Sequence, residues 1–345
     1  MHPWFYRISS SLMLPRAFSV SPRDGLTILL YHRFMAPGES RESGVERLRR
    51  QLDWLSSRYT LISMSEGFRH LAQGTLPPYR VVITVDDADL DLLDVYPVFE
   101  HFGVPPTIGV VVGWTDRETA DHDEPTVTRL IDYLHWYDGS AQRIDLGGGQ
   151  SVVVSGQHPR DQVIDQLLEG TEREGSSLVA SVWRQLSLDA PMGTPRANCN
   201  WSELLDLQRR GAEMASHSVS HCRLSRCSEA RLRFELEESR RVLSDRMSSC
   251  SDFVYPFGTD DMVDARTTSA VARSGYRCAL LTRAGLATAD MSPFHLPRIE
   301  IPDHRVETLE YRDRVLGGQI PFDVARRVTG RLLRRLTRDE LPGSA

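Results

Sequence analysis

The chain has 345 residues and a formal net charge of −6, with 40% hydrophobic and 26% charged residues. This composition is typical of a soluble globular protein with one large or two smaller domains, and the negative charge argues against a nucleic-acid-binding protein. The five cysteines are odd in number and include no Cys-x-x-Cys pair, which argues against a disulfide framework or a zinc finger.

The start of the chain lacks the charged and apolar regions of a signal peptide, and no apolar stretch approaches the ~20 residues that span a bilayer. We therefore expect a cytoplasmic protein. Residues 1–25, which precede the first predicted strand, are assigned to an N-terminal extension.

Seven short apolar runs predict β-strands, and amphipathic segments between them predict helices. The strands are expected at residues 26–31, 80–85, 107–112, 212–216, 252–255, 277–281 and 296–301. The helices are expected at residues 45–57, 91–101, 201–210, 228–245 and 264–274. This alternation predicts an α/β fold whose mainly parallel sheet forms a barrel or near-barrel over residues 26–302.

One long stretch, from about residue 115 to 200, breaks the alternation ahead of the strand at 212–216. Its sequence contains helix-like parts at 126–136 and 161–186 and a glycine-rich patch at 147–149. We expect an insertion that serves as a lid or substrate-selecting cap, or else a stabilising decoration of the domain.

The C-terminal segment, residues 303–345, is predicted to be a basic helical tail. Within residues 322–338 the apolar positions Val324, Val328, Leu332 and Leu336 lie four apart. Such a helix would pack on its own domain or lie on the anionic inner face of a membrane.

Two adjacent acids, Asp86 and Asp87, end the predicted strand at 80–85. Two carboxylates this close cannot both stay ionised without cost. A metal ion bound to one, with the other left as a free base, resolves the conflict. A capped turn is the structural alternative for this pair.

Two histidines, His217 and His221, follow the predicted strand at 212–216. Their spacing of four places both imidazoles on one side of a helical turn. With one carboxylate they would form a three-ligand metal site that leaves a position open for water, from which a second carboxylate can take a proton. Because barrel strands end at one face, we expect several polar groups to meet there, namely His32, Asp86, Asp87, His217 and the pair Tyr255-Pro256.

Five motifs resemble those of the polysaccharide deacetylases, carbohydrate esterase family 4, which include the NodB-type chitooligosaccharide deacetylases. Residues 84–91, Thr-Val-Asp-Asp-Ala-Asp-Leu-Asp, are similar to the family's Thr-Phe-Asp-Asp-Gly-x-x-Asp. Residues 217–221, His-Ser-Val-Ser-His, resemble its His-Ser/Thr-x-x-His, and residues 253–258, Phe-Val-Tyr-Pro-Phe-Gly, resemble its Tyr-Pro-x-Gly. Residues 29–33 and 296–299 are supporting matches, so the resemblance runs from about residue 26 to 301, while 115–200 matches no part of the family.

The resemblance implies a distorted (β/α)₇ barrel that removes an N-acetyl group from an amino sugar. In that reading Asp87, His217 and His221 hold one divalent metal ion, with zinc expected first and cobalt or nickel also accepted. Asp86 is the general base that activates the metal-bound water. The backbone N–H of Tyr255 would help to hold the oxyanion, and its ring would form a wall against the acetyl methyl.

This chain departs from the family pattern at three places. Ala88 stands where the family has glycine, and an alanine with positive φ would cost of order 1 kcal/mol there. Val254 stands where many relatives have an arginine that pairs with the base, and Arg298 is the candidate replacement. The motif that carries the general acid is not evident, so His32 is the first candidate and His295 the second.

The sequence thus predicts a metal-dependent carbohydrate N-deacetylase with catalytic residues Asp86 and His32. Tyr255, Pro256 and Arg298 are the expected substrate-binding residues. The expected substrate is an acetylated sugar, an oligosaccharide or a lipid-linked or nucleotide-linked glycan precursor, with no nucleic acid partner. Hydrolysis of another amide or of an O-acetyl ester is the alternative reaction, and a non-catalytic sugar- or metal-binding relative is the alternative class.

Overall fold

The computed structural model describes residues 23–35, 39–115, 141–154, 176–186, 198–248, 250–301, 311–312 and 314–315. The chain divides into two compact units, one formed by Met1–Asp116 with Asn198–Ala345 and the other by Arg117–Ala197. The predicted N-terminal extension lies almost entirely outside the described residues. So do the predicted helix at 126–136 and the amphipathic segment at 322–338.

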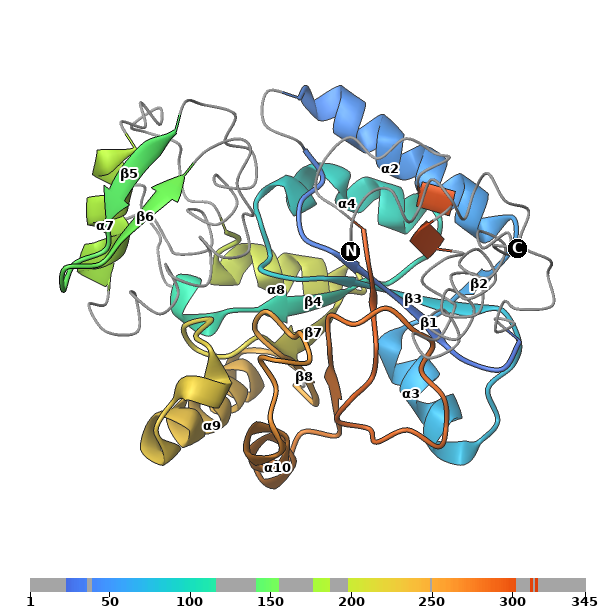
Figure 1. The fold of residues 1–345 in the computed structure, drawn as a ribbon. Helices are drawn as coiled ribbons and strands as arrows, with labels where there is room; N and C mark the ends of the chain where they lie inside the picture. Colours follow the sequence, from blue (N-terminus) through green and yellow to red (C-terminus); the bar gives the residue numbers. More distant parts are fainter. Residues whose placement is uncertain are drawn as a thin grey trace, which may run out of the picture. The chain divides into compact units, whose positions relative to one another are not determined.

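A curved parallel sheet forms the centre of the first unit (Figure 1). Its strands run in the order β10-β1-β3-β4-β7-β8-β9, and every neighbouring pair is parallel. The short strand β2 also pairs with β3. The bounds are β1 Thr27–Tyr31, β2 Thr60–Leu61, β3 Arg80–Val85, β4 Thr107–Val110, β7 Glu213–Ser216, β8 Asp252–Val254, β9 Cys278–Leu280 and β10 Ile299–Glu300. The predicted α/β fold with a distorted barrel is confirmed.

The last predicted strand, 296–301, is divided between two neighbours of the sheet. Ile299–Glu300 pairs with β1, whereas Leu296 makes a parallel bridge to Leu280 in β9. One segment therefore spans the two ends of the sheet and completes the curve, which is why only two of its residues form a strand.

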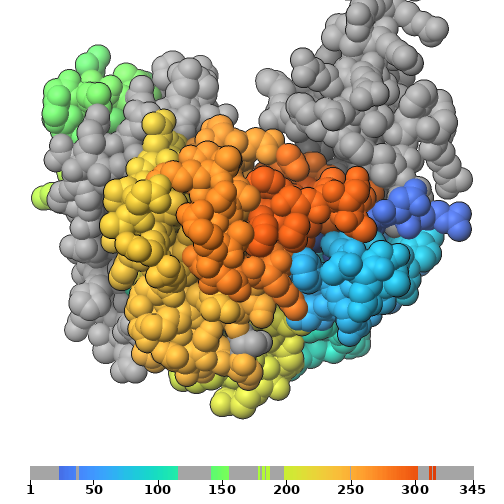
Figure 2. Space-filling view, turned by 90° about the horizontal axis from the view of Figure 1, so that it is seen from below, coloured from blue at the N-terminus to red at the C-terminus, as the bar shows by residue number. Residues whose placement is uncertain are grey.

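Helices cover the outside of the sheet (Figure 1). They are α2 Arg41–Ser56, α4 Asp91–His101, α8 Trp201–Arg209, α9 Glu229–Arg246 and α10 Ala265–Arg273. The side chains of Ser40, Ser228 and Asp264 cap the starts of α2, α9 and α10, and Asn200 forms a capping box with Glu203 at α8. The space-filling view from below shows α9 in gold beside α10 in orange (Figure 2).

Alternate strand residues face the inside of the barrel, where α3 (Met64–Gln73) fills the space. Val82, Ala215 and Val254 belong to this inner cluster together with Met64 of the helix. Gly67 permits the close approach, because a Cβ there would lie 2.8 Å from a methyl of Leu26. With the lower part of the barrel closed by apolar side chains, the polar residues gather at the other end of the strands.

The sequence-based description omitted β2 and α3. The helix begins with Ser63 as its N-cap, and this side chain accepts a hydrogen bond from the N–H of Glu66. The pattern Ser-x-x-Glu is a recognised helix start, so the signal was present in the sequence.

The second unit contains an antiparallel hairpin, β5 Gln142–Asp145 with β6 Ser151–Val154, and the helix α7 Ser176–Gln185. The hairpin turn is the glycine-rich patch, in which Gly147, Gly148 and Gly149 all have positive φ. Gln185 joins helix to hairpin, since its side chain bonds both the N–H and the C=O of Asp145. The predicted helix at 161–186 is described only from residue 176 onward.

No helix within the described ranges is long and apolar enough to span a membrane. All five cysteines fall in those ranges and are free thiols.

Candidate metal centre

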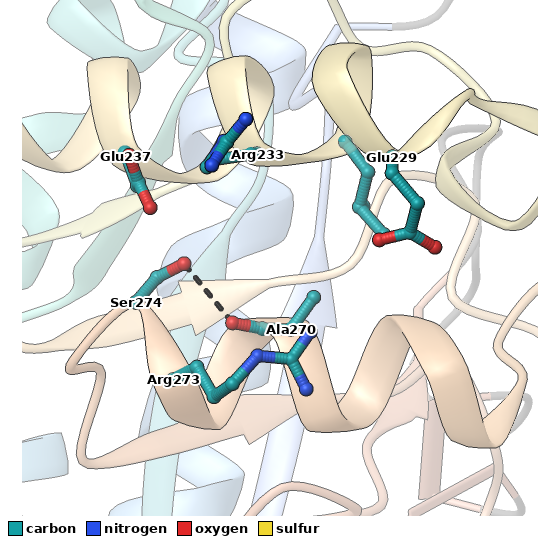
Figure 3. A pocket seen from close by; sticks show the side chains of 7 residues that line it. Glu229, Arg233, Glu237, Ala270, Arg273 and Ser274 are labelled. Carbon is teal, nitrogen blue, oxygen red and sulfur yellow. Dashed lines mark hydrogen bonds between the residues drawn. The ribbon is translucent and has the colours of Figure 1, made fainter.

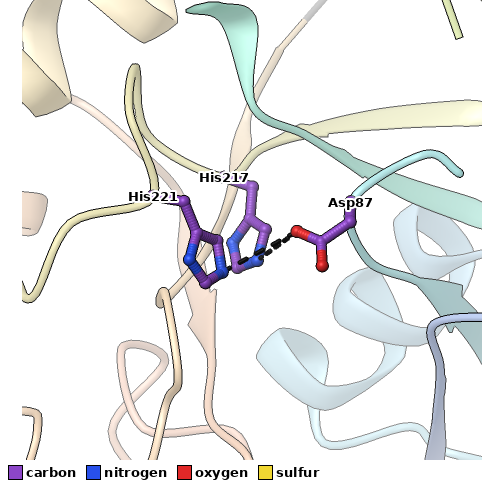
Figure 4. A group of neighbouring side chains, drawn as sticks. All are labelled: Asp87, His217 and His221. Carbon is purple, nitrogen blue, oxygen red and sulfur yellow. Dashed lines mark ion pairs between the residues drawn. The ribbon is translucent and has the colours of Figure 1, made fainter. Parts of the chain in front are cut away.

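Three buried side chains converge beyond the ends of β3 and β7, two strands that β4 separates in the sheet (Figure 4). Asp87 follows β3, and His217 and His221 belong to the turn after β7. Asp87 Oδ1 lies 3.6 Å from His217 Nε2 and 3.7 Å from His221 Nε2. Two ligand atoms at tetrahedral positions about 2.1 Å from a zinc ion lie roughly 3.4 Å apart. The structure therefore brings together the three predicted metal ligands at a separation that suits one shared ion.

The two imidazoles are in the neutral form that a metal ligand requires. Burial lowers the pKa of His217 to about 4 against the opposing effect of Asp86, and burial with His217 holds the pKa of His221 well below its ordinary value. His217 Nδ1 lies 2.9 Å from the carbonyl oxygen of Val254. An N–H at Nδ1 donating to this carbonyl leaves Nε2 as the free lone pair that faces Asp87. Two neutral imidazoles and one carboxylate are a donor set that zinc and similar divalent ions accept.

A buried arginine binds the carboxylate of Asp86 beside the metal ligands. Arg298, with 0% exposure, donates from Nη1 to Asp86 Oδ1 at 2.7 Å and from Nη2 to Asp86 Oδ2 at 2.8 Å. Arg298 also donates to the carbonyl of Leu281 and the hydroxyl of Thr84. Val254 cannot form an ion pair with Asp86, and Arg298 supplies it instead. Because Arg298 is fully buried, its structural role is to position Asp86.

The charge state of Asp86 follows from these neighbours. Burial raises the pKa of the carboxyl, but Arg298 and His217 outweigh this and lower the pKa to about 2. Asp86 Oδ2 lies 3.9 Å from His217 Nε2. Gly109 leaves room for the carboxylate, since a Cβ there would lie 3.1 Å from Asp86 Oδ1. Asp86 is therefore an ionised group beside the candidate metal position.

The turn that carries the two acids has an unusual backbone. Asp87 has φ 67° and Ala88 has φ 53°, so Ala88 does occupy the left-handed region that favours glycine. The segment after the second unit holds this turn in place. Asn198 Nδ2 donates to the carbonyl of Asp87, and Cys199 N donates to the carbonyl of Ala88. Asn198 was not identified from the sequence, because its long-range partner leaves no local pattern.

Aromatic rings enclose His221 on two sides. Trp114 stacks on the imidazole with ring centroids 5.5 Å apart, and Phe257 meets it edge-on at 4.7 Å. Trp114 ends the short 3₁₀ helix η2 (Val112–Trp114) after β4, and Phe257 has φ 61° in the turn after β8. Both rings fix the orientation of His221, and sequence reasoning gave neither residue a role.

His32 and His295, the two candidates for the general acid, occupy different environments. His32 follows β1, and its charge influences the pKa values of Asp86, His217 and His221. His295 Nε2 instead lies 2.9 Å from the hydroxyl of Thr268 on α10. The role of His32 as the general acid stays a prediction.

Tyr255 and Pro256 lie in the turn after β8 and are buried. The Tyr255 ring packs edge-on to Phe253, and its hydroxyl donates to the carbonyl of Phe294. Its backbone N–H donates to the carbonyl of Leu280. That amide is engaged in the sheet, which corrects the expectation that it is available to an oxyanion, and the ring belongs to the outer cluster rather than to the inner face. The substrate-binding roles of Tyr255, Pro256 and Arg298 stay predictions.

The remaining acids of the first motif tie neighbouring loops together. Asp89 Oδ2 accepts a hydrogen bond from Arg33 at 2.7 Å. Asp91 Oδ2 accepts from the backbone N–H groups of Phe34 and Met35, which follow β1. These contacts hold the loop that begins with His32 against the loop that carries Asp86 and Asp87.

A separate hollow lies between α9 and α10 on the outside of the barrel (Figure 3). Charged side chains line it, including Glu229, Arg233, Glu237 and Arg273. None of the three candidate metal ligands contributes to it, so it is distinct from the candidate metal centre.

Fold and site together define an α/β-barrel protein with a buried Asp-His-His centre, an arrangement used by metal-dependent hydrolases. A family model described as polysaccharide deacetylase matches residues 190–279, which include His217, His221 and Tyr255. A comparison with curated proteins found no match.

Several solved structures share the fold. The Streptococcus pyogenes deacetylase PplD in complex with acetate is 18% identical, with a TM-score of 0.54 over 84% of this chain and 98% of that one. IcaB from Ammonifex degensii is 15% identical, with a TM-score of 0.53 over 86% and 97%. The putative polysaccharide deacetylase BA0330 from Bacillus anthracis is 13% identical, with a TM-score of 0.52 over 84% and 69%. The family model thus covers about a quarter of the chain, and the solved structures show that the chain shares their fold.

Proposed function

We propose that this protein is a metal-dependent hydrolase that removes an N-acetyl group from an amino sugar in a glycan or a glycan precursor. The observation that carries the proposal is the convergence of Asp87, His217 and His221 beside an ionised Asp86. The match of residues 190–279 to the polysaccharide deacetylase model supports the reaction class.

Asp87, His217 and His221 would hold one divalent ion, with zinc as the first expectation. Such an ion, when bound, polarises the acetyl carbonyl and lowers the pKa of water. Asp86 would accept the proton of the attacking water, since its carboxylate is ionised and fixed by Arg298. His32 would donate a proton to the nitrogen of the leaving amino sugar.

Acetate is the acid product of this reaction, and the S. pyogenes deacetylase PplD was solved in complex with acetate. For this chain we infer that the acyl group transferred to water is likewise an acetyl group, carried on an acetylated sugar, an oligosaccharide or a lipid-linked precursor.

Two other functions share the same residues. Hydrolysis of a different amide or of an O-acetyl ester needs the same base and metal ligands. A non-catalytic sugar- or metal-binding relative is the other alternative, and the strained Ala88 is the feature that favours it.

The deciding experiment measures acetate release from a panel of N-acetylated and O-acetylated sugars and oligosaccharides, with and without a chelator. The proposal predicts chelator-sensitive release from an N-acetylated substrate, restored by added zinc. Release from O-acetyl esters alone would support the ester hydrolase. Stoichiometric metal binding with no release from any substrate would support the non-catalytic relative.

A further inference from the structure

The turn that connects the two histidine ligands has a backbone that needs external support. Ser218 has φ 68° and His221 has φ 55°, and neither is a glycine. Residues with a side chain disfavour this left-handed region, so such a turn persists only where its surroundings hold it. The hydroxyl of Ser218 accepts one hydrogen bond, from the N–H of His221 at 2.9 Å. The N–H groups of Val219 and Ser220, which lie between these residues, donate to a different group.

Those N–H groups donate to one buried carboxylate. Glu235 on α9 has 0% exposure, and its Oε2 accepts from the N–H of Val219 at 2.8 Å and of Ser220 at 3.0 Å. Its Oε1 accepts from the hydroxyl of Ser220 at 2.6 Å. Arg231, one helical turn earlier, lies 2.6 Å from Oε1 and also donates to the Ser220 hydroxyl. A charged acceptor with several donors makes stronger hydrogen bonds than a neutral one.

The opposite side of the same turn is fixed by η2. The N–H of Val112 donates to the carbonyl of Ser218 at 3.2 Å, and the N–H of Gly113 donates to the carbonyl of Val219 at 2.9 Å. The peptide groups of the turn are therefore held from both sides. Glu235 supplies the charged acceptor for the backbone N–H groups of Val219 and Ser220.

We propose that Glu235 is a positioning residue of the metal centre, which sets the turn so that the Nε2 atoms of His217 and His221 face Asp87 together. The inference rests on the proposed metal site. Glu235 touches none of the ligand side chains and acts through the backbone of Val219 and Ser220. Without its carboxylate these two N–H groups lose their acceptor, and the left-handed conformation of His221 loses its support.

The test compares Glu235→Ala and Glu235→Gln with Glu237→Gln, an exposed position on the same helix that lines the hollow between α9 and α10. Three quantities are measured on the full chain: the zinc dissociation constant by chelator competition, the visible absorption spectrum of the cobalt-loaded protein, and the melting temperature of the metal-free protein. The alanine variant should bind zinc at least about 10-fold more weakly, as losses around metal ligands commonly do. Its cobalt spectrum should differ from that of the wild type.

The glutamine variant should bind zinc with intermediate affinity, because its amide oxygen can still accept the two N–H bonds while the charge is lost. Glu237→Gln should match the wild type in every measurement. Wild-type zinc affinity and cobalt spectrum in both Glu235 variants would overturn the inference, even with a lowered melting temperature, since Glu235 would then serve the fold alone. Absence of zinc binding by the wild type would contradict the metal centre itself, and this inference with it.

Discussion

The pair formed by Asp86 and Arg298 joins two residues that are 212 positions apart. At the position where the resemblance implies an arginine before the Pro of the third motif, this chain has Val254, and the guanidinium comes instead from residue 298. The fork geometry of arginine, which meets both carboxylate oxygens, holds the base in one orientation.

Replacing Arg298 with Met should therefore change both stability and pH dependence. A buried carboxylate left without its partner commonly destabilises a protein by about 3–5 kcal/mol. In the wild type the pKa of Asp86 is about 2, so acetate release should show no acid limb from this group above about pH 3. Loss of the cation raises that pKa and should move an acid limb into the range of a pH–rate profile from 4 to 9. Identical profiles for the variant and the wild type would contradict the role given to Arg298.

Asp91 provides a pH-dependent test that is independent of catalysis. Burial, with Asp89 nearby, raises the pKa of its carboxyl from an unfolded value of 3.8 to about 7. The folded state thus binds the proton more tightly than the unfolded state. This contribution to stability is fully present below pH 3.8 and is lost as the pH rises toward 7 and above.

Asp91→Asn keeps an oxygen that can accept the N–H groups of Phe34 and Met35 and removes the titration. Between pH 5 and pH 8 the wild type should lose about 3 kcal/mol of unfolding free energy relative to the variant. Denaturant unfolding of both proteins at the two pH values measures this difference, and parallel stabilities would show that Asp91 does not titrate in this range.

At the scale of elements, the sequence predicted best where local pattern and long-range packing agree. The predicted helix at 91–101 coincides with α4, and the run at 80–85 coincides with β3. The predicted strand at 107–112 ends earlier, at Val110, because η2 begins at Val112 and turns its amides toward the histidine turn.

The residues of the candidate site also differ in whether a local sequence pattern identifies them. Asp87, His217 and His221 carry a spacing that can be recognised in a sequence, and the structure places them together. Glu235 and Asn198 hold the turns of the site through contacts between residues 15 to 111 positions apart. No periodicity or motif encodes such contacts, so only the folded chain identifies these residues.

Gly113 offers a test of how η2 supports the histidine turn. A Cβ at this position would lie 2.6 Å from the carbonyl oxygen of Val219, a contact that forces the backbone to move. Gly113→Ala should therefore displace the turn and weaken zinc binding by about 10-fold or more, by analogy with other losses near metal ligands. Chelator competition measures the affinity. An unchanged affinity would mean that the two loops can separate without disturbing His221.

For the whole molecule, the barrel gathers ligands from strands that are distant in sequence, so metal binding and folding should be coupled. Free zinc at 100 times its dissociation constant stabilises a one-site protein by about 2.7 kcal/mol. Zinc should raise the melting temperature of the wild type, and His217→Ala should lose most of this increase. An equal shift in both proteins would place the zinc elsewhere.

The most direct measurement compares Asp86→Asn with Asp87→Asn in metal content and in acetate release from an N-acetylated oligosaccharide. Asp87 is assigned to hold the metal, so Asp87→Asn should lose both metal and activity. Asp86 is assigned to take a proton, so Asp86→Asn should keep its metal while turnover falls by roughly 10²–10⁴. Loss of metal in Asp86→Asn with retention in Asp87→Asn would reverse the two roles, and full activity in both variants would contradict the deacetylase centre.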